Sequence, residues 1–157
     1  MSGFRRGVRL GIDVGRARVG VARCDPDGML AVPVETVPRD EASIDRILQI
    51  AQEYDPLEFV VGLPVNMQGA DTLSTTDARE FAAVLHRRSR VPVRLVDERL
   101  STVTAHAALR SSGRSQKKSR SIVDQVAAVV LLQQAIDMEK STGNPAGAMI
   151  PSDEEPA

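Results

Sequence analysis

Acidic residues stand at three places in this 157-residue chain where a carboxylate could do chemistry. Asp13 lies inside the alternating run Leu10-Gly11-Ile12-Asp13-Val14-Gly15, Asp97 and Glu98 follow a short apolar stretch, and Asp124 precedes two alanines. Mg²⁺ and Mn²⁺ prefer carboxylate oxygens, and two such ions about 3.5 to 4 Å apart activate water and stabilise a leaving oxygen. Gathered at one edge, these acids would suit metal-dependent phosphodiester hydrolysis.

Each acid also has a purely structural explanation. Asp13 could accept hydrogen bonds in a turn, and Asp97 could pair with Arg99. Asp124 would suit any helix N-terminus, because a negative charge there complements the helix dipole. The structural explanation is weakest for Asp13, since a carboxylate without a partner inside a strand is costly.

Hydrophobic periodicity predicts the elements that position these acids. Period-two alternation predicts three strands whose connecting turns make an antiparallel meander. Two more apolar strands follow, each preceded by an amphipathic helix, and two helices complete the order. The predicted strands are 8–14, 18–24, 29–37, 58–62 and 93–97, and the predicted helices are 41–54, 73–88, a helix from 101 or 102 to 109, and 121–138.

This order predicts an α/β domain of the RNase H-like type. Its mixed five-stranded sheet would combine an antiparallel meander with parallel strands and carry helices on both faces. A doubly wound nucleotide-binding fold would instead place a helix directly after its first strand. We expect one domain over residues 1–139 and a disordered acidic tail rich in proline and glycine over residues 140–157.

Composition narrows the function classes. With Cys24, His86 and His106 as the only sulfur and imidazole donors, a closed zinc site has too few ligands, so a metal here would be a hard cation held by oxygens. Aromatic residues make up 3% of the chain, too few for a platform that stacks several bases. Apolar segments are too short to span a bilayer, so we expect a cytoplasmic protein without membrane contact. An exposed Cys24 could join two chains, so a monomer, a weak homodimer and a Cys24-linked dimer stay open.

The net charge of -1 conceals an uneven distribution. Residues 86–120 hold ten of the 20 basic residues but only two acids, Asp97 and Glu98. A concentrated basic segment can neutralise phosphates whatever the total charge, although a solvated loop would look the same. The candidate nucleic-acid-binding residues are Arg16, Arg18, Arg99, Arg110, Arg114, Lys117, Lys118 and Arg120.

Four ordered motifs between about Val8 and Met138 resemble those of the YqgF/RuvX family. They are Leu10-Gly11-Ile12-Asp13-Val14-Gly15 with Arg18-Val19-Gly20-Val21-Ala22, Val60-Val61-Gly62-Leu63-Pro64 with Met67-Gln68-Gly69, Asp97-Glu98-Arg99-Leu100-Ser101-Thr102, and Asp124-Gln125-Val126-Ala127-Ala128. The resemblance implies a bacterial cytoplasmic nuclease of RNase H-like fold, related to Holliday-junction resolvases. It also implies a role in maturing the 5′ end of precursor 16S ribosomal RNA.

By this resemblance, Asp13, Glu98 and Asp124 would be the catalytic residues. With Asp97 as a near-equal candidate for the second position, they would bind Mg²⁺ or Mn²⁺, with two ions expected. The chain departs from many RNase H-like nucleases at Gly62, because the strand that ends there carries no acid. The second acid must then come from Asp97 or Glu98.

Four functions remain open. The first is a metal-dependent endonuclease of structured RNA, and the second is a resolvase that cuts four-way DNA as a dimer. A third, a sugar-kinase or actin-like ATPase lobe, matches Asp13-Val14-Gly15, but the chain is too short to supply a second lobe. The fourth is a non-catalytic RNA-binding ribosome assembly factor in which the acids are structural.

Overall fold

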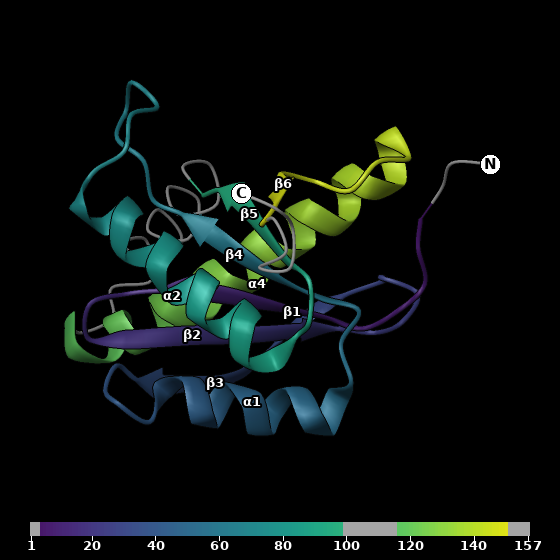
Figure 1. Cartoon of the computed structure of the whole chain (residues 1–157). Coiled ribbons are helices and arrows are strands. Elements are labelled where there is room, and N and C mark those ends of the chain that lie inside the picture. Colours follow the sequence, from purple (N-terminus) through teal and green to yellow (C-terminus); the bar gives the residue numbers. More distant parts are fainter. Residues whose placement is uncertain (1–3, 99–115, 151–157) are drawn as a thin grey trace.

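The structure is a computed structural model that describes residues 4–98 and 116–150, with the backbone alone for 116–124. Three strands come first, and helices and strands alternate after them (Figure 1). In order they are β1 (Arg9–Val14), β2 (Arg18–Cys24), β3 (Ala31–Pro38), α1 (Ser43–Tyr54), β4 (Glu58–Leu63), α2 (Leu73–Ser89), β5 (Val93–Asp97), α4 (Gln116–Thr142) and β6 (Ala148–Met149). The predicted helix ending at residue 109 lies outside the described residues, and α4 begins earlier than the predicted start at residue 121.

The strands form one mixed sheet in the order β3-β2-β1-β4-β5-β6. The first three strands pair antiparallel as the predicted meander, and β1, β4 and β5 run parallel. This arrangement confirms the predicted mixed α/β class. The described sheet has six strands where five were expected, because β6 pairs antiparallel with β5.

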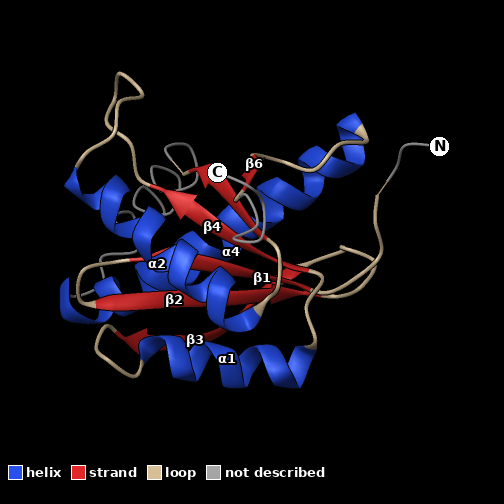
Figure 2. Ribbon diagram, viewed as in Figure 1, coloured by secondary structure: helices blue, strands red, loops and turns tan. Residues whose placement is uncertain are grey.

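Helices cover both faces of this sheet (Figure 2). An apolar cluster joins one face to α1 and α2 through residues such as Ile47, Ile50 and Leu85. A second cluster joins the other face to α4 through Ala128, Leu131 and related residues. Because both faces are covered, the central strands β1 and β4 are buried along their whole length.

The turn between β2 and β3 includes Met29 and Leu30, which the apolar pattern had assigned to the next strand. The carboxylate of Asp25 accepts hydrogen bonds from the backbone N–H groups of Asp27, Met29 and Leu30 at 2.8 to 3.1 Å. These bonds hold Met29 and Leu30 in the turn, where they are 72% and 61% exposed. Strand β3 therefore begins at Ala31 rather than at residue 29.

Residues 140–150 belong to the domain, so the expected boundary at residue 139 and the expected disorder from 140 are wrong for this stretch. Helix α4 continues to Thr142, Ala146 is 4% exposed, and the Ile150 N–H donates to the carbonyl oxygen of Val93 at 2.9 Å. Gly147 makes the close return possible, since a Cβ there would lie 2.2 Å from the carbonyl oxygen of Leu95. The rest of the expected tail, 151–157, lies outside the described residues.

Candidate active site

The sheet face under α4 collects alternate residues of β1. Leu10 and Ile12 pack in the cluster under α1 and α2, so Gly11 and Asp13 face α4. Gly11 touches the helix directly, because a Cβ there would lie 2.9 Å from the carbonyl oxygen of Ala128. Asp13 lies two residues farther along the same face, near the carboxyl end of β1, and it is 9% exposed.

The same alternation along β5 separates the two neighbouring acids. Asp97 pairs in register with Leu63, which belongs to the cluster under α1 and α2, and Asp97 is exposed. Glu98 follows on the opposite face, where Val96 packs against the α4 cluster. The Glu98 N–H donates to the carbonyl oxygen of Leu63 at 3.2 Å, and Glu98 is only 9% exposed. Of these two acids, Glu98 shares the buried face with Asp13.

Asp13 and Glu98 form a buried pair whose side chains are hydrogen-bonded to each other. Burial raises the pKa of Glu98 to about 9, helped by the charge of Asp13, by this hydrogen bond and by the charge of Asp97. At neutral pH and without metal, the pair therefore holds one shared proton. A divalent cation held by carboxylate oxygens would take the place of that proton, so the donor set fits Mg²⁺ or Mn²⁺.

Gly62 makes room for the Glu98 carboxylate. A Cβ at Gly62 would lie 2.2 Å from Glu98 Oε2 and 3.2 Å from Glu98 Cβ. The strand that lacks an acid thus provides the space that an acid from β5 occupies. In the sequence, the lack of an acid at Gly62-Leu63 is a signal that the second carboxylate comes from another strand. The sequence does not show that β4 and β5 are neighbours, so it does not link Gly62 to Glu98.

The third predicted acid, Asp124, lies in α4 one helical turn before Ala128. Helix α4 and β1 run in opposite directions, because Glu139 meets Arg9 while Ala128 lies over Gly11. The helix backbone therefore places residue 124 toward the Asp13 end of this face, while its side chain lies outside the described residues. No cluster of three His, Cys, Asp or Glu side chains suited to a metal occurs in the described part of the chain.

Two of the predicted phosphate-binding residues lie in or next to the turn that follows β1. Arg16 is exposed in the turn after β1, and Arg18 begins β2 and is half-buried. Lys117, Lys118 and Arg120 belong to the first turns of α4, where only the backbone is described. Arg99, Arg110 and Arg114 lie outside the described residues.

Arg39 supports the turn after Asp13 and was missed in the sequence. Its guanidinium binds both carboxylate oxygens of Asp77 at 2.9 and 2.8 Å and donates to the carbonyl oxygen of Gly15 at 3.0 Å. The β1–β2 turn is thereby tied to α2, which steadies the position of Arg16. A lone arginine after a strand carries no sequence signal for this role.

Cys24 is fully buried and accepts a hydrogen bond from the Arg9 N–H at 3.3 Å. The thiol is not on the surface, which argues against a Cys24-linked dimer. His86 does not take part in the candidate site. Its ring is hydrogen-bonded to the carbonyl oxygen of Val91 at 2.9 Å. Among the described helices, none has the length and apolar character needed to cross a membrane.

Comparisons with known proteins agree with this fold and with the family that the motifs resemble. Residues 7–138 match the RuvX family, described as Holliday junction resolvase. A protein of Clavibacter michiganensis subsp. michiganensis named "Putative pre-16S rRNA nuclease" is 54% identical over 151 residues, covering 94% of each chain. One of the same name from Streptomyces coelicolor is 53% identical, covering 92% of this chain and 88% of its own length.

Among solved structures, Thermus thermophilus RuvC shares the fold. Its complex with a Holliday junction substrate superimposes with a TM-score of 0.55 at 18% identity, covering 88% of this chain and 98% of RuvC. Another RuvC structure from the same organism gives a TM-score of 0.53. The profile match and the relatives above 50% identity extend over nearly the whole chain, and on that basis it is a member of the RuvX family.

Proposed function

We propose that this chain is a cytoplasmic, metal-dependent endonuclease that cleaves phosphodiester bonds of precursor 16S ribosomal RNA. The buried Asp13–Glu98 pair carries the proposal, because two carboxyl groups that meet on one face of the sheet at 9% exposure form a donor set for a hard cation. A purely structural role explains the pair poorly, because burying two carboxyl groups at 9% exposure lowers the stability of the core. The substrate is inferred from the names of the relatives at 54% and 53% identity.

Asp13 and Glu98, with Asp124 from α4, are the residues that would hold the metal. Glu98 rather than Asp97 takes the second position, because Asp97 faces the other side of the sheet. Bound Mg²⁺ or Mn²⁺, with two ions expected, would activate a water molecule and stabilise the leaving oxygen. Asp97 acts from outside this set, as a nearby negative charge that favours the protonated form of Glu98.

The remaining residues hold and orient the polyanion. Arg16 and Arg18 lie at the end of β1 that carries Asp13, where they can bind phosphates flanking the cleaved bond. Further basic residues follow between positions 99 and 120 of the sequence. Because the net charge is -1, attraction is local rather than spread over the protein, and binding should weaken steeply with salt.

The experiment compares cleavage of precursor 16S RNA by the wild type and Asp13→Asn, with divalent metal and with chelator. We expect metal-dependent cleavage by the wild type and none by the variant. The variant also controls for a copurifying nuclease. Full activity of a folded Asp13→Asn protein would contradict the proposal.

Resolution of four-way DNA is the second candidate, favoured by the family description and by the fold shared with RuvC. Symmetric cuts in two strands need two active sites, so this activity would require a dimer on the junction. Matched RNA and junction substrates in the same assay distinguish the two. A strictly monomeric protein in the presence of junction DNA would count against resolution. No metal binding in calorimetry, together with no cleavage of either substrate, would leave an RNA-binding assembly factor in which the acids are structural.

A further inference from the structure

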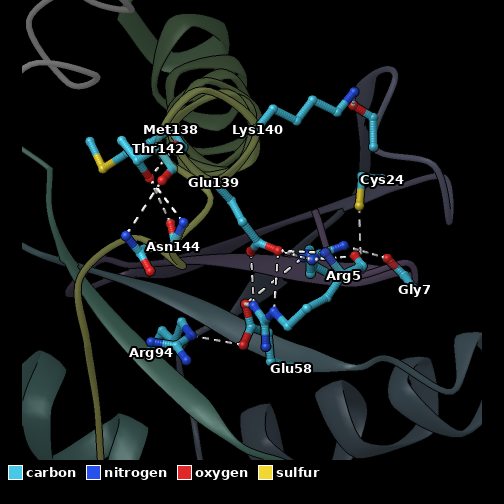
Figure 3. Close-up of polar contacts among 12 residues, drawn as sticks. Arg5, Gly7, Cys24, Glu58, Arg94, Met138, Glu139, Lys140, Thr142 and Asn144 are labelled. Atoms are coloured by element: carbon cyan, nitrogen blue, oxygen red, sulfur yellow. Dashed lines mark hydrogen bonds and ion pairs between the residues drawn. The ribbon is translucent and has the colours of Figure 1, made fainter. Parts of the chain in front are cut away.

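A buried ionic network lies at the far end of the face that carries Asp13 and Glu98. Arg9 opens β1, Glu58 opens β4, and Arg94 of β5 donates to Glu58 Oε1 at 2.9 Å. Glu139 reaches this network from α4 and accepts a hydrogen bond from Arg9 Nη2 at 3.1 Å. Figure 3 shows Glu139 of the helix above Glu58 and Arg94 of the sheet. Arg9, Glu58 and Glu139 are each 2% exposed.

Glu139 is held more tightly than an ordinary helix surface residue. Its carboxylate accepts bonds from the Arg5 backbone N–H at 2.8 Å, from Arg5 Nε at 3.2 Å and from Arg5 Nη2 at 2.9 Å, besides the bond from Arg9. Burial alone would raise the pKa of Glu139, but the hydrogen bonds from Arg5 and the charge of Arg9 hold it below its usual value. The carboxylate therefore stays charged and fixed at neutral pH.

The contacts along α4 set its register on β1. Glu139 lies at Arg9, and Ala128 and Leu132 lie on Gly11, where a Cβ would come within 2.9 Å of both. Residue 124 stands about 22 Å before Glu139 along the helix axis, toward Asp13. A slip of one residue would move the helix by about 1.5 Å and turn it by about 100°, which would carry residue 124 off this face.

We propose that Glu139 is a positioning residue for the active site: by fixing α4 to Arg5 and Arg9, it sets where Asp124 stands relative to Asp13 and Glu98. An apolar contact at this point would tolerate sliding, whereas a buried carboxylate with four hydrogen bonds accepts one register only. Register selection is the best-attested use of buried polar groups, which otherwise add little stability. The proposal rests on the nuclease function and adds a residue to its machinery.

Glu58 provides a matched control. It has the same exposure and binds the same arginines, Arg5 at 3.0 Å and Arg9 at 3.9 Å, but it belongs to the sheet and not to α4. Loss of either carboxylate should destabilise the fold. Only the loss of Glu139 should release the helix.

The experiment compares Glu139→Ala with Glu58→Ala at a temperature where both are folded. For Glu139→Ala we expect kcat to fall at least tenfold with KM nearly unchanged, and for Glu58→Ala we expect both constants to stay within about twofold of the wild type. If either alanine variant does not fold, the pair Glu139→Gln and Glu58→Gln decides the same comparison. Equal kcat in the two variants would overturn the proposal.

A second readout does not depend on activity. Spin labels on exposed Gln134 of α4 and exposed Gln49 of α1 report the helix position in the metal-free protein. We expect the distance distribution to shift or broaden in Glu139→Ala but not in Glu58→Ala, and unchanged distances would overturn the proposal. If the wild type does not cleave while this difference appears, the nuclease function fails and the register role of Glu139 stands.

Discussion

Replacing Glu98 by glutamine should stabilise the metal-free protein, and increasingly so as the pH rises. The Asp13–Glu98 pair holds a proton because burial raises the pKa of Glu98 to about 9 from the usual 4.5. Glu98→Gln keeps the size of the side chain and an N–H that donates to Asp13. The substitution removes the Glu98 carboxyl group, which has to stay protonated when the protein is folded.

The sign follows from proton binding in the two states. Between pH 4.5 and about 9, Glu98 is protonated in the folded protein and ionised in the unfolded chain. The folded state then binds more protons, so the free energy of unfolding falls as pH rises, by up to about 1.4 kcal/mol per pH unit. At pH 7 this amounts to about 3 kcal/mol, which Glu98→Gln would recover. Below pH 4.5 the two proteins should differ little.

Urea denaturation at pH 5, 6, 7 and 8 with a chelator measures this difference. Asp97→Asn is the matched control, because Asp97 is exposed and faces the other side of the sheet. It should keep most of the pH dependence of the wild type. A constant difference in unfolding free energy between wild type and Glu98→Gln across this range would refute the buried pair. Added Mn²⁺ should then stabilise the wild type and not Glu98→Gln.

Three further predictions test the surroundings of the pair. Gly62→Ala should weaken metal binding, measured by calorimetry, by about 10- to 100-fold, because its Cβ would lie 2.2 Å from Glu98 Oε2; unchanged affinity would contradict the packing. Glu58→Ala should lower the free energy of unfolding by about 3 kcal/mol, since it leaves buried cations with one partner fewer; a loss below about 1 kcal/mol in urea would argue against the network. Cys24 should react with a thiol reagent only as the protein unfolds, because the thiol is fully buried and burial raises its pKa; rapid labelling of the native protein, or a disulfide-linked dimer, would oppose this placement.

Most of the fold was predictable because its signals are local. The alternation in β1 and the Asp25-Pro26-Asp27-Gly28 turn specify the meander without distant contacts. The order of residues 143–150 was not predicted, because their glycines and proline are typical of disordered segments. Their order comes from long-range contacts of a few residues, such as Ala146 in the α4 cluster and Ile150 beside Val93, which composition does not show.

The choice between Asp97 and Glu98 was not available from the sequence. Strand β5 is covered on both faces, so Leu95 and Val96 are both apolar and the pattern does not tell which side α4 covers. The ionic network was hidden for a related reason. Arg9, Glu58 and Glu139 look like surface residues one by one, and only the strand register and the path of α4 bring them together.

Metal-dependent cleavage of precursor 16S RNA by Glu98→Gln and Asp97→Asn, measured side by side under single-turnover conditions, tests the role of the buried pair most directly. Each substitution replaces one carboxyl group by an amide, at adjacent residues on opposite faces of the sheet. We predict that Glu98→Gln loses cleavage and that Asp97→Asn keeps a rate within about tenfold of the wild type, equivalent to less than about 1.4 kcal/mol in the barrier. Cleavage that survives in Glu98→Gln and disappears in Asp97→Asn would contradict the assignment.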